Sequence, residues 1–205
     1  MRSGDDMDHV IPVSSRSPQT VALVTAARAA LPTRAARTSS SVLERLWKTY
    51  RAEPVHLLRT REGRCLSRDR YRRAEAFLLG ITPGTSRDWP DCLYQAGIVA
   101  QLALSSHLLD VGFPDDWCAQ QLGLEVARSL AYANATGLGY ECDETARLAQ
   151  VLTPYWKWNR RALVDTPHPN DGGFTPNQVA DLLRALLDHV KHVTGHRALR
   201  SRMRS

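Results

Sequence analysis

The chain has 205 residues, of which 43% are hydrophobic and 23% charged, with a formal net charge of +6. These values are ordinary for a globular protein of one domain with tails. They exclude a membrane-spanning segment of roughly 18 uninterrupted apolar residues, because Gln101 and His107 break the most apolar stretch. The N-terminal residues 1–8 carry three Asp and no apolar core of a secretory signal. We therefore expect a cytoplasmic protein with no membrane partner.

The charges are distributed unevenly along the chain. Residues 1–75 hold 15 Lys and Arg against 8 Asp and Glu, and residues 151–205 hold 9 against 4. The middle, residues 76–150, reverses the balance with 3 against 9. The basic ends are either solvated surface, or they bind a polyanion or the acidic middle of a second copy.

The N-terminal third begins with a polar segment. Residues 1–19 are rich in Ser, Asp, Arg and Pro, and we expect a disordered tail there. The apolar pattern then predicts a first helix over Thr20–Leu31, ended by Pro32. The serine run before Val42 offers an N-cap for a second helix over Val42–Arg51.

Residues 55–66 are the only segment that suggests strands. Two short apolar runs on either side of Gly63 predict a short two-stranded hairpin, which would need support from neighbouring helices. Ser67 follows directly and is expected to cap a third helix, Arg68–Leu79. A loop with several prolines then leads to the centre of the chain.

The centre of the chain predicts two helices folded back on each other. The first, Cys92–Val111, is apolar on nearly all sides, which is typical of the middle of a bundle. The second, Asp115–Asn134, carries apolar residues four apart, the spacing of one buried helical face. The link Gly112-Phe113-Pro114 joins them. We expect this central αα-hairpin to organise the fold.

The C-terminal third predicts three more helices. Asp143 caps a short helix that ends at Leu152, and the pair Thr153-Pro154 starts another over Tyr155–Val164. A cap and a proline at Thr175-Pro176 then open the most regular amphipathic helix, with its apolar stripe over Val179–Val193. Gly195 ends this helix, and residues 197–205 form a basic tail.

These elements predict an all-α fold. We expect a helical bundle of six to eight helices around the central αα-hairpin, with one short β-hairpin near residues 55–66. The bundle forms a single domain over residues 20–196. Its core is the hairpin Cys92–Asn134 packed against the helix Val179–Val193.

An arginine cluster is the main candidate for a binding site. Guanidinium groups pair with phosphate oxygens through two parallel hydrogen bonds, so a dense cluster suits a phosphate backbone. A solvated face partly paired with Glu62, Asp69 and Glu75 gives the same pattern. The seven arginines lie within 15 residues: Arg59, Arg61, Arg64, Arg68, Arg70, Arg72 and Arg73.

A second basic segment, residues 155–161, alternates aromatic rings with cations. Rings stack on bases while cations neutralise phosphates, as in proteins that hold single-stranded nucleic acid. Lys157, Arg160 and Arg161 are therefore further candidates for nucleic-acid binding. On one helix, however, Tyr155 and Trp158 would share a face away from Trp156, which equally suits a core or a subunit contact.

The sequence favours no metal site and no cofactor. His189, His192 and His196 lie near the end of the last helix, but Gly195 breaks that helix and no Glu stands between them as a catalytic base. The four cysteines include no C-x-x-C pair.

One histidine lies on the central helix beside an acid. His107 and Asp110 form an acid–imidazole pair with Ser105 and Ser106 nearby, which suggests a hydrolase. The chain has no G-x-S-x-G motif, and consecutive residues of one helix point in different directions. A structural core histidine is the preferred interpretation.

Three functional hypotheses follow. The first is a non-enzymatic, cytoplasmic helical protein that binds nucleic acid through its basic regions. The second is a protein-interaction or scaffold subunit that forms a homo- or hetero-oligomer. The third, with least support, is an enzyme that uses His107 or the loop Asp165–Phe174.

Overall fold

A computed structural model describes residues 34–81, 88–159 and 169–197. This part of the chain contains seven α-helices and no strand, which confirms the predicted all-α bundle and its number of helices. Three short turns of other helical types connect them: the 3₁₀ turns η1 (Leu79–Ile81) and η3 (Tyr155–Trp158) and the π turn η2 (Cys118–Leu122). The α-helices are α1 (Arg34–Tyr50), α2 (Arg61–Leu78), α3 (Trp89–Val111), α4 (Asp115–Trp117), α5 (Val126–Ala135), α6 (Asp143–Val151) and α7 (Pro176–Thr194).

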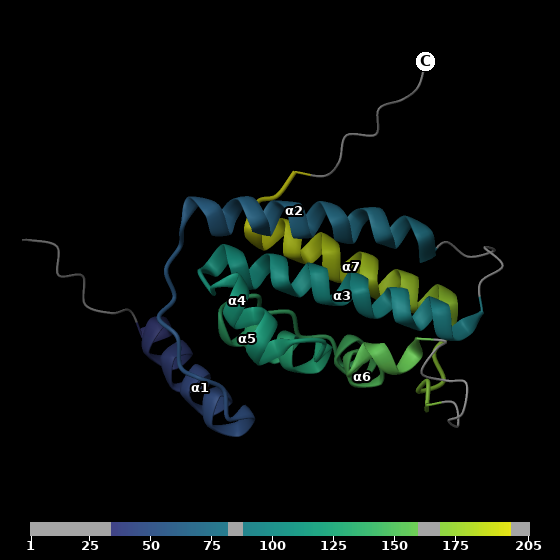
Figure 1. Cartoon of the computed structure of the whole chain (residues 1–205), viewed down its shortest axis with the longest axis horizontal. Helices are drawn as coiled ribbons and strands as arrows, with labels where there is room; N and C mark the ends of the chain where they lie inside the picture. The colour runs from purple at the N-terminus through teal and green to yellow at the C-terminus, as the bar shows by residue number, and fades with distance from the viewer. Residues whose placement is uncertain (1–33, 82–87, 160–168, 198–205) are drawn as a thin grey trace, which may run out of the picture.

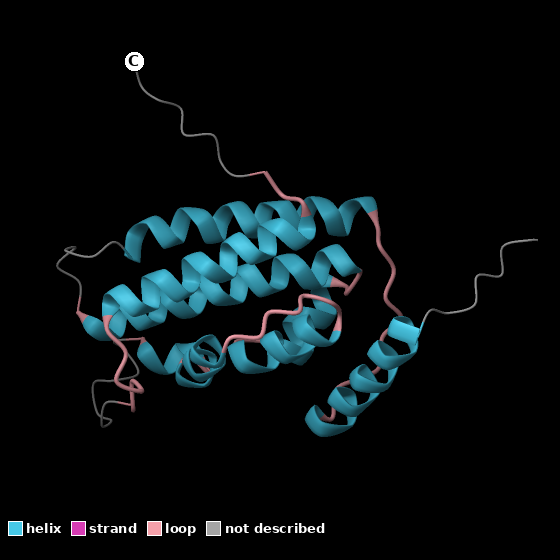
Figure 2. Ribbon diagram, turned by 180° about the vertical axis from the view of Figure 1, so that it is seen from behind, coloured by secondary structure: helices cyan, strands magenta, loops and turns pink. Residues whose placement is uncertain are grey.

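Helix α3 lies at the centre. Figure 1 shows α2, α3 and α7 side by side, with α4, α5 and α6 along the other side of α3 and α1 at one end of the molecule. The view from behind in Figure 2 shows the same arrangement. Helix α3 contacts α2, α5, α7 and η3, and it buries most of its residues from Leu93 to Leu109.

The length and hydropathy of α3 also meet a simple criterion for a membrane-spanning helix. Its most apolar window has a mean hydropathy of 1.2, and 78% of that window is buried by the rest of the protein. The central helix of a folded bundle meets the same criterion, so composition alone does not distinguish the two.

Helix α7 is the predicted amphipathic helix, and it packs against α3 as expected. Thr175 caps it, and its side chain and that of Gln178 bond to each other's backbone in a capping box. Its buried side chains include Val179, Leu183 and Val190. Gly195, in a left-handed conformation, ends the helix as predicted.

The expected β-hairpin over residues 55–66 is wrong. Residues 51–60 form an irregular link, and α2 begins at Arg61 because Thr60 caps it by accepting a hydrogen bond from the Gly63 amide at 2.9 Å. Gly63 therefore lies inside a helix, where its missing Cβ lets the Leu109 carbonyl of α3 approach closely. Ser67 is fully buried within α2 and does not cap it.

Other predicted boundaries also change. The second arm of the central hairpin is not one helix, because η2 and Gly123 (φ +54°) divide it into α4 and α5. Helix α1 begins at Arg34 instead of Val42. The helix expected over Tyr155–Val164 starts as η3, and its remainder lies outside the described residues, as do the N-terminal tail, the first expected helix and residues 198–205.

Candidate anion-binding surface

Helix α2 separates the arginine cluster onto two sides. With 3.6 residues per turn, residues three or four apart share a helical side. Arg61, Arg64, Arg68 and Arg72 therefore form one row, which we call the arginine stripe. Arg70 and Arg73 lie on the opposite side of the helix. The buried face of α2 between these sides carries Ser67, Tyr71 and Ala74.

The arginine stripe borders a hollow beside the C-terminal end of α7. Arg61, Arg64 and Arg68 line an open hollow of about 490 Å³ together with Asp110, Thr194, Gly195 and His196. A smaller hollow of about 280 Å³ continues along α2, lined by Arg68, Tyr71, Arg72, Gly195, His196 and Arg197. The two share Arg68, Gly195 and His196, and we call them together the basic groove.

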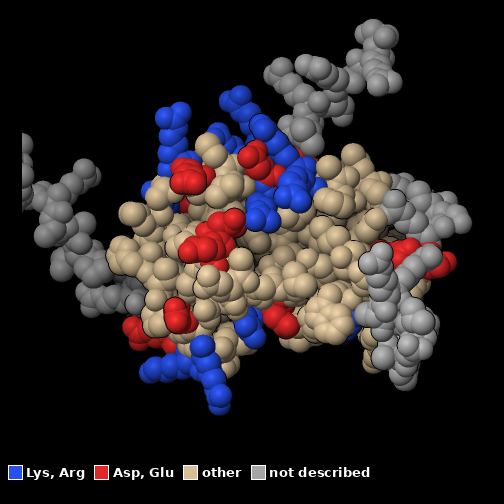
Figure 3. Space-filling model, in the orientation of Figure 1, with Lys and Arg blue, Asp and Glu red and all other residues tan. Residues whose placement is uncertain are grey.

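The basic groove keeps an excess of positive charge. Asp110, the one acidic residue among the described residues that line it, pairs with Arg59 at 3.4 Å, and Asp69 lies 3.9 Å from Arg72. Within the described residues, Arg61 and Arg64 have no acidic partner at ion-pair distance. Figure 3 shows Lys and Arg gathered along the upper edge of the molecule, over α2, with a few acidic side chains among them.

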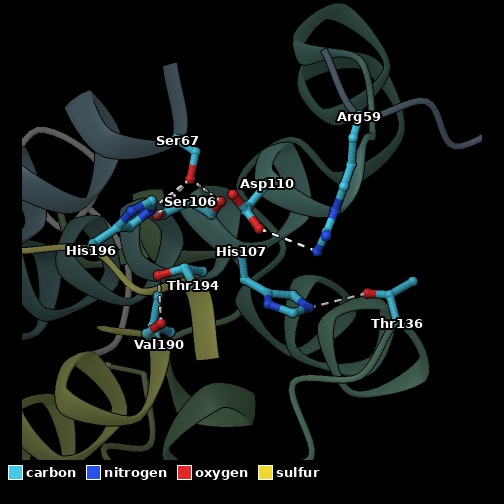
Figure 4. Close-up of polar contacts among 9 residues, drawn as sticks. All are labelled: Arg59, Ser67, Ser106, His107, Asp110, Thr136, Val190, Thr194 and His196. Atoms are coloured by element: carbon cyan, nitrogen blue, oxygen red, sulfur yellow. Dashed lines mark hydrogen bonds and ion pairs between the residues drawn. The ribbon is translucent and has the colours of Figure 1, made fainter. Parts of the chain in front are cut away.

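A buried hydrogen-bond cluster lies next to the groove and includes its lining residue His196 (Figure 4). The Ser67 hydroxyl donates to the Ser106 carbonyl at 2.6 Å, and His196 Nε2 lies 2.7 Å from Ser67 Oγ and 3.1 Å from Ser106 Oγ. Because the Ser67 proton is already donated, Nε2–H of His196 is the donor to Ser67. The cluster joins α2, α3 and the segment after α7, and so holds His196 in place beside the stripe.

Burial lowers the pKa of His196 below its usual value. Asp110 raises this pKa, and the nearby guanidiniums of Arg68 and Arg72 lower it further. The Ser67–His196 contact has the length of a nucleophile–base pair. Ser67 is fully buried, however, so no substrate reaches its oxygen and the cluster acts as a structural contact.

His107 is a core histidine, as the sequence favoured. It is 1% exposed, and Thr136 Oγ1 lies 3.4 Å from its Nε2, while its Nδ1 has no partner among the described atoms. Asp110 pairs with Arg59 instead of His107. Burial lowers the pKa of His107 to about 4, although Asp110 opposes this shift.

This burial predicts an acid-sensitive fold. Since the pKa of His107 is about 4 in the folded state and roughly 6.5 in an unfolded chain, the unfolded chain binds more protons between these values. Stability contributed by neutral His107 is therefore present above about pH 6.5 and is lost as the pH falls toward 4. Urea unfolding should show a loss of roughly 2 kcal/mol between about pH 7.5 and pH 5.

The variant His107→Gln isolates this contribution, because glutamine does not titrate. Its stability should depend less on pH than that of the parent, while the exposed His192→Gln serves as the control and should follow the parent. His196 contributes in the same direction, so some pH dependence remains. Identical pH dependence in the parent and His107→Gln would contradict the assignment.

The described part of the second basic segment, residues 155–159, does not line the basic groove. Lys157 donates to the Thr153 carbonyl at 2.8 Å, and burial lowers its pKa. Trp158 is 1% exposed and lies in the core, whereas Trp156 is 52% exposed. Arg160 and Arg161 lie outside the described residues.

The sequence also singled out the histidines near the end of α7 and the loop before that helix. Among the described residues, no group of three or more His, Cys, Asp or Glu side chains could hold a metal ion. His189 lies 2.7 Å from the Leu138 carbonyl, so it points away from His196. In the loop that the third hypothesis would use, Asp171 accepts from the Trp89 indole at 2.8 Å and from the Gly173 amide at 2.9 Å.

The Ser67–Ser106–His196 cluster is the part that the sequence did not predict. Its members are 39 to 129 residues apart, and none belongs to a recognisable motif. The sequence offered one signal for this cluster. His196 directly follows Gly195, which ends α7, and the chain can turn back toward the bundle at such a position. Comparisons of the chain with protein-family models, with curated proteins and with solved structures find no match.

Proposed function

We propose that this protein binds nucleic acid without catalysing a reaction, and that its basic groove holds the phosphate backbone. The observation that supports this proposal is the arginine stripe, which faces a hollow open enough for a polymer. From Arg61 to Arg72 the stripe extends about 16 Å along α2, close to the length of five base pairs of B-DNA.

The chemistry of the groove suits phosphate more than other anions of similar size. Four guanidinium groups in a row offer planar, paired donors to successive phosphate groups. Arg197 on the opposite wall adds a further cation. Since no base-reading motif accompanies these side chains, the contacts position a backbone and carry no sequence preference.

The protein-interaction hypothesis has weaker support. Large exposed apolar side chains of the kind that form a subunit contact include Leu58, Leu79 and Trp156, at 64%, 77% and 52% exposure. They come from three different segments of the chain, and scattered apolar side chains are ordinary on protein surfaces.

Salt dependence tests the proposal. Binding to a phosphate backbone releases counterions, so the affinity for mixed-sequence DNA and RNA should fall log-linearly with salt. Replacing the four stripe arginines with Gln should weaken binding to all sequences alike and reduce the slope by about 0.9 for each duplex phosphate contact that is lost. Fluorescence anisotropy across a salt series measures both quantities.

A control variant with the same loss of charge distinguishes the effect of the groove arginines from the effect of net charge. The variant with Arg45, Lys48, Arg147 and Arg184 changed to Gln removes four exposed cations from outside the groove. This variant should retain most of the affinity for nucleic acid and most of the slope of that affinity against salt. Equal weakening in the two variants would show that only net charge matters, and no binding at about 50 mM salt would reject the proposal.

A further inference from the structure

A second hollow lies on the other side of α2 from the basic groove. It measures about 420 Å³ and lies between α2, α3, η3 and the segment Cys118–Leu124. We call it the apolar groove after the apolar side chains that line part of it. These are Phe77, Ile98, Leu102, Leu124 and Tyr155.

In the part of the chain that the structure describes, the groove carries one cation without an acidic partner. Arg70 and Arg73 both line it, but Arg70 Nη2 lies 3.1 Å and 3.3 Å from the two carboxylate oxygens of Asp115. The charges of Arg70 and Asp115 therefore offset each other. Arg73 has no ion pair with any acidic side chain that the structure describes. Among the described residues, the groove thus combines several apolar side chains with one guanidinium that has no acidic partner.

Two uncharged polar residues, Gln101 and Ser105, also line the groove. The Ser105 side chain lines the groove although only 8% of the residue is exposed. Gln101 is held by reciprocal contacts with Ser129, at 3.1 Å and 3.2 Å. Small-molecule sites are typically concave, combine apolar side chains with placed polar groups, and have volumes of roughly 300–1,000 Å³.

The shape of the groove depends on the π turn η2. This turn and Gly123 (φ +54°) interrupt the helical path, and both contribute lining residues. Leu124 directly after them is 40% exposed, and Phe77 across the groove is 37% exposed. A ligand that covers these side chains removes apolar surface from water, which favours binding. Single π turns are frequent at functional sites.

We propose that the apolar groove binds a small organic monoanion with an apolar body, of the class of medium-length alkyl carboxylates. Arg73 binds the carboxylate, and the apolar walls cover the hydrocarbon chain. A polyanion fits poorly, because Asp115 also lines the groove and, among the described residues, Arg73 is the one lining guanidinium without an acidic partner. This inference is independent of nucleic-acid binding, since it uses the opposite side of α2.

Octanoate is a suitable probe, with 1-octanol as its uncharged match and acetate as the anion without an apolar body. Calorimetric titration of the full chain should show saturable octanoate binding with a Kd below about 1 mM. Octanol should bind about tenfold more weakly, because it lacks the charge-assisted contact with Arg73. Acetate should show no measurable binding.

Three variants assign the binding to the groove. Arg73→Gln should weaken octanoate binding about tenfold and leave octanol binding unchanged. Phe77→Ala should weaken both ligands, because it removes part of the wall. Arg64→Gln, on the arginine stripe, is the matched control and should bind octanoate as the parent does. Circular dichroism checks that each variant is folded.

Several results would overturn the proposal. Equal affinity for octanoate and octanol would remove the role of Arg73, and equal effects of Arg73→Gln and Arg64→Gln would place binding elsewhere. Absence of octanoate binding, together with a dimer that Phe77→Ala weakens in sedimentation velocity, would assign the groove to a second copy of the chain instead.

Discussion

Replacing Leu104 with aspartate is expected to prevent the chain from folding. Leu104 is 1% exposed at the middle of α3, where it meets Val126 of α5 and Leu183 of α7 around a small apolar gap. An unpaired carboxylate at this position costs several kcal/mol, and the lost apolar contacts add to that cost. A domain of this size has a total stability of roughly 5–15 kcal/mol.

Circular dichroism and thermal melting measure this effect. The matched control is Leu79→Asp, since Leu79 is 77% exposed and its carboxylate would remain in water. The control should melt close to the parent, whereas Leu104→Asp should show no cooperative transition. A melting temperature of Leu104→Asp within a few degrees of the parent would show that α3 is not the centre of the fold.

Gly112→Ala is expected to destabilise the protein by about 2–5 kcal/mol. Gly112 ends α3 at φ +111°, which costs an L-residue roughly 1–2 kcal/mol. A Cβ at this position would also lie 2.6 Å and 2.7 Å from backbone atoms of Leu58 and 2.9 Å from the Arg59 amide nitrogen. The link to α2 would have to move, and overpacking of this kind costs about 1–3 kcal/mol.

Gly137→Ala provides the matched control for this clash. Gly137 has a comparable φ of +96°, but a Cβ there would meet nothing within 4 Å. It should therefore cost only the conformational part, roughly 1–2 kcal/mol. Denaturant unfolding of both variants gives the contribution of the close approach by difference. Equal losses of stability would mean that the segment before α2 moves freely away from Gly112.

The helices were predictable from sequence where a local signal matched the tertiary packing. Helix α7 has both a cap at Thr175 and a regular apolar stripe, and its bounds agree closely with the pattern. Helix α3 was placed at the centre because it is apolar on all sides. In both cases the same residues determine the local structure and the buried contacts.

Helix α2 was predicted only in part because its packing overrides the local signal. Gly63 suggested a turn, yet in α2 it is the residue that allows the Leu109 carbonyl close to the helix. Ser67 suggested a helix start, yet it is buried by bonds to Ser106 and His196. The sequence analysis therefore did not predict that the arginine cluster separates onto two sides, because this separation requires one continuous helix that begins at Arg61.

The Ser67–Ser106–His196 cluster has a consequence for how the chain selects one packing of its helices. Apolar contacts alone discriminate poorly among rotations or one-turn slips of α3, because apolar residues occur on most of its sides. Each slipped arrangement would bury Ser67 without its partners, at about 1–3 kcal/mol for each unpaired polar group. The cluster therefore raises the free energy of these competing arrangements above that of the native one, and so helps to fix the rotation and position of α3 in the bundle.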